Sequence, residues 1–212
     1  MMNEKQVLLT EMELDALQET MNISFGSAAA DLAEIMDIFI QLTVPNISSV
    51  KIHDLPDYIN REISDFATCS VVQQKYYGDF EGMAFLIFPY GNERDLISYF
   101  QSSGTDFFQS DQLIDLEREV LLEISNILIG ACIGRIFEML NSRISYQPPQ
   151  IISGSDFDRT YVSSEFDSRD LAITMKTFFS FEDRNTKGYL ILINSQSSIP
   201  HLKKALSQFI GE

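Results

Sequence analysis

The chain has 212 residues, with 31 acidic and 15 basic side chains and a formal net charge of −16. Because phosphate contacts need clustered lysine and arginine, this acidity excludes nucleic-acid or anionic-membrane binding through a basic surface. The longest apolar stretch, Met83 to Pro89, is too short to span a bilayer, and the N-terminus lacks a signal-peptide pattern. We therefore expect a cytoplasmic protein that has neither nucleic acid nor membrane as a partner.

The first half of the chain is predicted to begin with a long helix from Thr10 to about Asp37. Thr10 followed by Glu13 is typical of a capping box, in which each side chain accepts a hydrogen bond from the other residue's backbone N–H. A proline-interrupted strand, a loop, two strands joined at Gly78-Asp79 and a shorter helix follow. We place these strands and the shorter helix at 39–52, 66–77, 82–88 and 93–101.

The second half is predicted to repeat this order. Its elements are a helix at 110–141, strands at 143–152, 171–181 and 188–193, and a helix at 199–210. Asn185-Thr186 is the expected turn between the last two strands. The order α-β-β-β-α, found twice, indicates the α+β class with a mostly antiparallel sheet and two long helices.

The repeat is also visible residue by residue when the chain is shifted by 104 positions. The shift aligns four identical pairs: Glu19 with Glu123, Asn22 with Asn126, Gly26 with Gly130, and Pro45 with Pro149. Asp15 falls on Glu119, which is another acid. Since the unit is too long for a solenoid repeat, we expect a single domain, residues 1–212, built from two halves, 1–104 and 105–212.

The chain lacks the residues of ordinary enzyme sites. His53, expected at a strand end, and His201, expected in the last helix, have no Cys, Asp or Glu at metal-ligand spacing. Cys69 and Cys132 are too few for a disulfide scaffold and are expected to be buried. The acids between 156 and 170 fail the EF-hand pattern, because Tyr161 stands where glycine is needed, and they predict a solvated loop.

A polar stripe runs along each long helix. At about 100° per residue, Asp15, Glu19 and Asn22 share one face of the first helix, opposite its apolar face. Gly26 and further small residues continue that stripe, which leaves a shallow face that a partner's backbone can approach. The second helix repeats the stripe with Glu119, Glu123, Asn126 and Gly130.

Acids on an exposed helix face are most often plain solvated surface. Here, however, a mid-helix asparagine and a mid-helix glycine each cost about 0.5–1 kcal/mol relative to alanine, and both recur at the same spacing. This repetition favours a functional role, although common ancestry of the halves would also leave some of it. An asparagine amide can hold a water in line with a phosphorus atom, and a carboxylate can pair with a partner's lysine. Such a site suits a phosphate activated on a partner that supplies its own metal.

The pattern Asp/Ser-x3-Glu-x2-Asn-x22-Pro resembles that of the CheC/CheX/FliY phosphatases of chemotaxis. It is carried by Asp15, Glu19, Asn22 and Pro45, and again by Glu119, Glu123, Asn126 and Pro149. Two copies of the motif make the chain most similar to CheC, although Glu119 replaces the usual Asp or Ser. The family's duplicated α-β-β-β-α plan matches the predicted order over nearly the whole chain.

The resemblance implies hydrolysis of the aspartyl phosphate on a CheY-type response regulator. Asn22 and Asn126 would then orient the attacking water, and Glu19 and Glu123 would contact the regulator's lysine. The Mg²⁺ would lie on the regulator, so no cofactor is expected on this chain. A CheD-like receptor deamidase is a second partner that the resemblance implies.

Two alternatives stay open at this point. The chain would act as a non-catalytic adaptor if it only binds a phosphorylated regulator or a CheD-like partner. A hydrolase of small molecules would need a nucleophile or a metal set that the sequence does not offer. Exposed strand edges also leave homodimerisation open.

Overall fold

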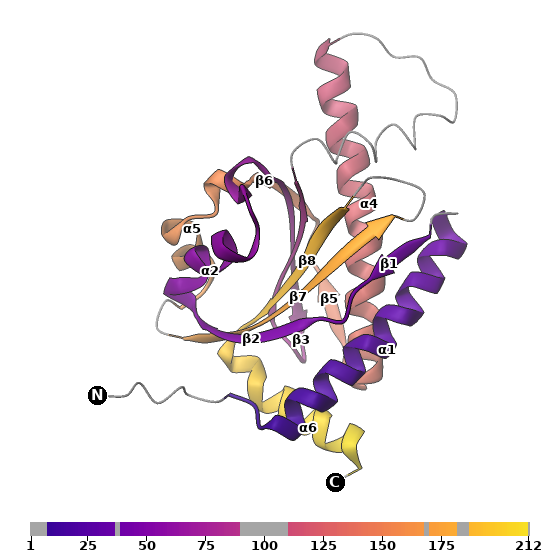
Figure 1. The fold of residues 1–212 in the computed structure, drawn as a ribbon, viewed down its shortest axis with the longest axis vertical. Coiled ribbons are helices and arrows are strands. Elements are labelled where there is room, and N and C mark those ends of the chain that lie inside the picture. Colours follow the sequence, from indigo (N-terminus) through magenta and orange to yellow (C-terminus); the bar gives the residue numbers. More distant parts are fainter. Residues whose placement is uncertain (1–7, 37–38, 90–109, 168–169, 182–186, 212) are drawn as a thin grey trace.

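The computed structural model describes residues 8–36, 39–89, 110–167, 170–181 and 187–211. Two long helices, α1 (Glu11–Met36) and α4 (Ser110–Met139), lie across one face of a sheet together with the last helix, α6 (Ile199–Ile210) (Figure 1). All three were predicted from the sequence. The predicted helix at 93–101 and the turn at Asn185-Thr186 lie outside the described residues.

The described residues form a sheet of eight strands that all pair in the antiparallel sense, which confirms the α+β class. The order is β1-β7-β8-β4-β3-β5, with β2 also paired to β7 and β6 also paired to β3. Their bounds are β1 (Ile40–Leu42), β2 (Asn46–Lys51), β3 (Ser70–Gly78), β4 (Gly82–Phe88), β5 (Ile144–Tyr146), β6 (Gln150–Ser153), β7 (Leu171–Phe181) and β8 (Lys187–Asn194). The proline-interrupted strand of each half is thus two short strands.

The two halves exchange strands within this sheet. Asn46 of β2 pairs with Lys176 of β7, and Gln150 of β6 pairs with Gln73 of β3. Each short strand of one half therefore lies beside a long strand of the other half. The expected boundary at 104/105 falls outside the described residues, so the division into two repeats stays a prediction.

The long connections were wrongly predicted as loops. Residues 52–65 contain a short 3-10 turn, Ile52–Asp54, which holds His53, and a helix α2 (Leu55–Glu62). Pro56 opens α2 at a position where its missing N–H is harmless, and Leu55 and Ile59 are buried on one face. Phe66–Thr68, predicted as strand, is another 3-10 turn.

The acidic segment of the second half was also wrongly predicted as a loop. It contains helix α5 (Arg159–Glu165), whose first turn is capped by Asp158 accepting from the N–H of Tyr161 at 2.8 Å. Glu165 forms an ion pair with Lys75 of β3. These acids therefore hold a local structure rather than a solvated loop.

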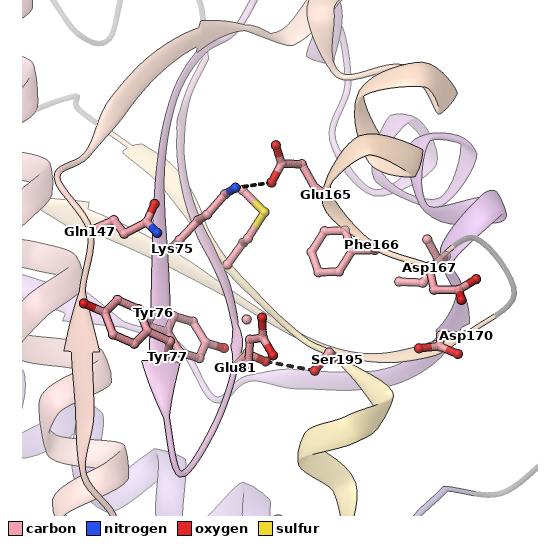
Figure 2. A pocket seen from close by; sticks show the side chains of 13 residues that line it. Lys75, Tyr76, Tyr77, Glu81, Gln147, Glu165, Phe166, Asp167, Asp170 and Ser195 are labelled. Atoms are coloured by element: carbon pink, nitrogen blue, oxygen red, sulfur yellow. Dashed lines mark hydrogen bonds and ion pairs between the residues drawn. The ribbon is translucent and has the colours of Figure 1, made fainter.

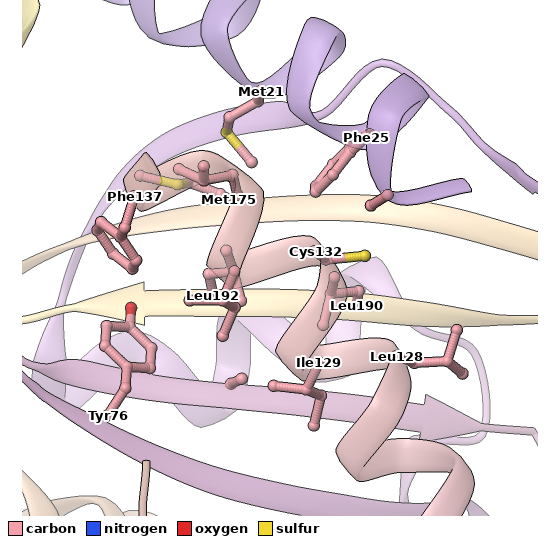
Figure 3. Close-up of a cluster of buried hydrophobic side chains, with 14 of the residues drawn as sticks. Met21, Phe25, Tyr76, Leu128, Ile129, Cys132, Phe137, Met175, Leu190 and Leu192 are labelled. Carbon is pink, nitrogen blue, oxygen red and sulfur yellow. The ribbon is translucent and has the colours of Figure 1, made fainter. Parts of the chain in front are cut away.

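Two hydrophobic cores lie on the two faces of the sheet. The larger one joins the sheet to α1, α4 and α6, and the smaller one joins it to α2 and α5. Figure 3 shows side chains of the larger core, with Met21 and Phe25 of α1 and Ile129 and Cys132 of α4 directed at the strands. Both cysteines are buried, and burial raises the pKa of the Cys132 thiol to about 12.

Part of α4 is long and apolar enough to cross a membrane by length and composition alone. This segment, Arg118–Met139, has a mean hydropathy of 1.8, and half of it is buried inside the fold. Ile129 and Ile133 are fully buried against the sheet, whereas Glu119 and Glu123 are exposed. The larger core therefore accounts for much of the apolar character of this helix.

The hairpins of the two halves repeat one packing detail. A Cβ on Gly82 would lie 2.5 Å from the Tyr76 hydroxyl, and a Cβ on Gly188 would lie 2.3 Å from the ring of Phe179. Each glycine thus lets an aromatic side chain cross over it in the larger core. Tyr76 donates to Asn194 at 2.7 Å, so its polar end is satisfied although buried.

The capping box predicted at the start of α1 is confirmed. The Thr10 N–H donates to Glu13 Oε2 at 2.7 Å, and the Glu13 N–H donates to Thr10 Oγ1 at 3.2 Å. We expect Thr10→Ala to lower the free energy of unfolding by about 1 kcal/mol, measured by urea titration. Thr10→Ser keeps the hydroxyl and should stay near wild type; an equal loss in both variants would contradict this role of the hydroxyl.

Glu13 also makes stability depend on pH. Burial by itself raises the pKa of Glu13, but the Thr10 N–H and Lys203, 3.3 Å away, lower it overall. A carboxylate with a lowered folded-state pKa stabilises the fold above its unfolded value and loses that contribution as pH falls through the folded value. The difference in unfolding free energy between wild type and Glu13→Gln should therefore shrink from about pH 5 to about pH 3. A difference that stays constant over this range would contradict the assignment.

Candidate functional site: the polar stripes of the two long helices

The stripe on α1 has the exposure that its spacing predicted. Asp15, Glu19, Asn22 and Gly26 are all exposed, while Leu17 and its neighbours on the opposite face are buried. The buried set is Leu17, Met21, Phe25, Ala28 and Leu32. The helical phase inferred from the sequence is therefore confirmed, and the chemical roles of these residues stay predictions.

The stripe on α4 is arranged in the same way. Glu119, Glu123 and Asn126 are exposed, whereas Gly130 is half-buried. The opposite face fills the core with Leu121, Leu128, Ile129, Cys132 and Ile136. Each helix thus presents two acids and an asparagine to solvent.

The two stripes belong to separate sites. The helices contact each other where Asp31 accepts two hydrogen bonds from Arg135, at 2.7 and 3.0 Å, and where Ser24 donates to Met139. These contacts pair rising numbers on α1 with falling numbers on α4, so the helices run in opposite senses (Figure 1). Asp31 and Arg135 each lie nine residues beyond the asparagine of their helix, about 13 Å along the axis. Asn22 and Asn126 therefore lie on opposite sides of the crossing.

An ion pair between two half-exposed side chains, Asp31 and Arg135, holds the helices together at this crossing. The Arg135 guanidinium holds the pKa of the Asp31 carboxyl below its ordinary value, through a hydrogen bond and through its charge. Asp31 and Arg135 are themselves related by the shift of 104 residues. Equivalent positions of the two halves thus meet each other here.

The surroundings of Asn22 are open and partly apolar. Gln18 Nε2 donates to the Pro45 carbonyl at 3.1 Å, which ties the motif proline to α1. Ile23 and Val44 are 44% and 57% exposed. The Asn22 amide makes no hydrogen bond within the part of the chain that the structure describes. This stripe therefore offers an exposed amide that no described side chain holds in one orientation.

The surroundings of Asn126 are different, because a buried side chain of β3 reaches it. Gln74 Nε2 donates to Asn126 Oδ1 at 3.0 Å and to the Gln147 carbonyl at 3.0 Å. The Oε1 atom of Gln74 is buried with no hydrogen-bond partner among the described residues, a cost of about 1–3 kcal/mol. Sequence reasoning missed Gln74, although its alternation with Val72 and Tyr76 marks a polar residue on a buried strand face.

The glycines of the stripes lie in open surroundings. A Cβ built on Gly26 or on Gly130 would meet no atom within 4 Å, apart from the helix's own nearby backbone. Packing inside the protein therefore does not explain glycine at either position. A close approach by another molecule would explain it, which agrees with the shallow face expected from the sequence.

A pocket of about 480 Å³ lies on the other face of the sheet. Its lining includes Lys75, Tyr77, Glu81, Glu165 and Asp170 (Figure 2). Lys75 is paired with Glu165 across the pocket, and the remaining charges are mostly acidic. Within the described ranges no three His, Cys, Asp or Glu side chains gather as a metal site. No residue of either stripe lines this pocket.

Comparisons with known proteins bear on the first motif and on the fold. Residues 12–49, which contain the first motif from Asp15 to Pro45, match the CheC-like family. The chain is similar to the crystal structure of Thermotoga maritima FliY, at 18% identity and a TM-score of 0.65 over 95% of this chain and 98% of that one.

Two further solved structures share the fold. A CheX from Desulfovibrio desulfuricans is 11% identical at a TM-score of 0.52, over 84% of this chain and 99% of that one. A chain of the FliG–FliM complex from H. pylori is also 11% identical, at a TM-score of 0.54, over 92% of this chain and 100% of that one.

The chain thus carries a CheC-like segment at residues 12–49 and shares the fold of FliY and CheX. The motif that carried the resemblance in the sequence lies inside the matched segment. The second motif, on α4, lies outside that segment, and its assignment depends on the repeat within the chain.

The open surroundings of Gly26 make a prediction about stability. Gly26→Ala should raise the free energy of unfolding by about 0.5–1 kcal/mol, because alanine is the better helix former and its methyl meets nothing. Gly78→Ala is the matched control, since its φ is +138° and a Cβ would lie 2.5 Å from the Arg143 carbonyl. That variant should be destabilised. Urea titration measures both, and a destabilised Gly26→Ala would show that the fold itself requires this glycine.

Proposed function

We propose that the chain is a cytoplasmic phosphatase that removes the aspartyl phosphate from a CheY-type response regulator. The observation that carries this proposal is the exposed Glu-x2-Asn pair on each long helix, with an open glycine one turn further on. The family match over the first motif supports it. A CheD-like deamidase is a further proposed partner.

The reaction needs little from this chain beyond positioning. A water oxygen bonds to phosphorus, the bond from phosphorus to the aspartate oxygen breaks, and phosphate and a free carboxylate result. The water's proton passes to solvent. The side-chain oxygen of Asn22 or Asn126 would accept a hydrogen bond from the water. The water oxygen would then point a lone pair at phosphorus. Mg²⁺ held by the regulator would stabilise the charge on the phosphoryl group.

The acids of the stripes would serve recognition. Glu19 and Glu123 lie one helical turn before their asparagines and are exposed, so each can pair with a lysine of the regulator. Asp15 and Glu119 extend the contact by a further turn. The bare glycine surface at the other end of the stripe allows the regulator's backbone to approach closely.

A second candidate is a non-catalytic adaptor for a protein partner. It is favoured by the likeness to a chain of a FliG–FliM complex and by the lack of any reactive side chain in the stripes. The two candidates differ in one measurable respect. An adaptor binds phosphorylated regulator and leaves its dephosphorylation rate unchanged.

The test is the decay of phosphate on a CheY-type receiver domain labelled with radioactive acetyl phosphate. Wild type should accelerate the decay, and Asn22→Ala combined with Asn126→Ala should lower this acceleration roughly a hundredfold. Asn60→Ala is the matched control, because Asn60 is an exposed helical asparagine whose side chain donates, among the described residues, to Pro56 of its own helix. A double variant as active as wild type would refute the mechanism, and no acceleration by wild type would favour the adaptor.

A further inference from the structure

Gln74 makes the two motif asparagines unequal. It is 3% exposed, and the two hydrogens of its Nε2 are used by the Gln147 carbonyl and by Asn126 Oδ1. A main-chain carbonyl can only accept, so Gln74 must turn its nitrogen toward Gln147. That nitrogen can then bond only an oxygen of Asn126. The Gln147 carbonyl thereby sets the orientation of the Asn126 amide through Gln74.

The orientation decides which end of Asn126 faces solvent. With Oδ1 turned inward to Gln74, the Nδ2 group is the end left for a ligand on the exposed side. A water has two lone pairs: an N–H donor occupies one of them, whereas an acceptor takes an O–H and leaves both lone pairs free. An inward oxygen is therefore the less suitable arrangement for aiming a water at phosphorus, and it suits a donor bond to an acceptor on the partner.

The equivalent position of the first site holds a shorter residue. Strand register makes Lys176 the counterpart of Gln73, since each pairs with the residue that follows a motif proline. The counterpart of Gln74 is thus Thr177, and the counterpart of Gln147 is Thr43. Thr177 donates its single hydroxyl hydrogen to the Thr43 carbonyl, which repeats one of Gln74's two bonds. The second bond is missing, and the Asn22 amide can turn its oxygen outward.

We propose that Gln74 is a positioning residue that clamps Asn126 with its N–H group outward, so that the Asn22 site hydrolyses the phosphate and the Asn126 site mainly holds the partner. This inference rests on the proposed phosphatase function. It assigns the buried, half-satisfied Gln74 side chain a role that packing alone does not give it.

The first test compares single variants in the receiver-domain assay. Asn22→Ala should remove most of the acceleration, whereas Asn126→Ala should retain most of kcat and raise KM. An equal loss of kcat in both variants would overturn the inference and leave the proposed function intact. A double variant with wild-type activity would refute the function itself, so the two failures are distinguishable.

The second test releases the clamp with the residue that the other half uses. In the Asn22→Ala background, Gln74→Thr should raise kcat about five- to tenfold, the weight of one hydrogen bond. In the Asn126→Ala background, Thr177→Gln should lower kcat by a similar factor. A purely structural Gln74 would give no gain in kcat, and that outcome in a folded Gln74→Thr protein would overturn the proposal.

A third measurement needs no partner and no activity. In the free protein, the side-chain NH₂ signals of Gln74 should exchange slowly with solvent, because both hydrogens are bonded and buried. The side-chain NH₂ signals of Asn126 should exchange quickly, and a chemical-shift change there in Gln74→Thr would report the lost bond. Unchanged Asn126 signals in a folded Gln74→Thr protein would overturn the clamp.

Discussion

The structure depends on the exchange of strands between the two halves of the chain. β2 of the first half completes the sheet beside β7, and β6 of the second half completes it beside β3. Each of these short strands directly follows a motif proline, so the pairing holds the segment that follows each long helix at the sheet. The helices then meet at Asp31 and Arg135, and their apolar faces close the larger core. Everything presented on the outer faces of α1 and α4 is placed by these pairings.

The outer faces of α1 and α4 carry few functional groups on well-packed helices. A helix turned by its core packing presents every third or fourth residue outward, so an acid and an asparagine three residues apart share one face. Neither side chain reacts by itself, and their value lies in where the fold holds them.

Much of this arrangement could be predicted from the sequence because it is local. The Thr10–Glu13 capping box, the phase of Asn22 on its helix and the bounds of β4 follow from spacing along one element. Helix α2 was missed because it is only eight residues long, and its signal is a proline followed by few buried positions. Gln74 was missed for a different reason: its contact with Asn126 joins residues 52 positions apart, and spacing along the chain carries no trace of it.

The crossed support of the two sites has a consequence for how the halves can diverge. Gln74 lies in the first half and reaches the motif of the second, while Thr177 lies in the second half and secures the loop of the first. Each half thus supplies a strand residue that contacts the motif helix or the motif loop of the other half. A half separated from the chain would keep its motif and lose the strand that shapes it. Substitutions in one half can therefore retune the other's site without touching that site's own residues, which gives a duplicated protein a route to two different specificities.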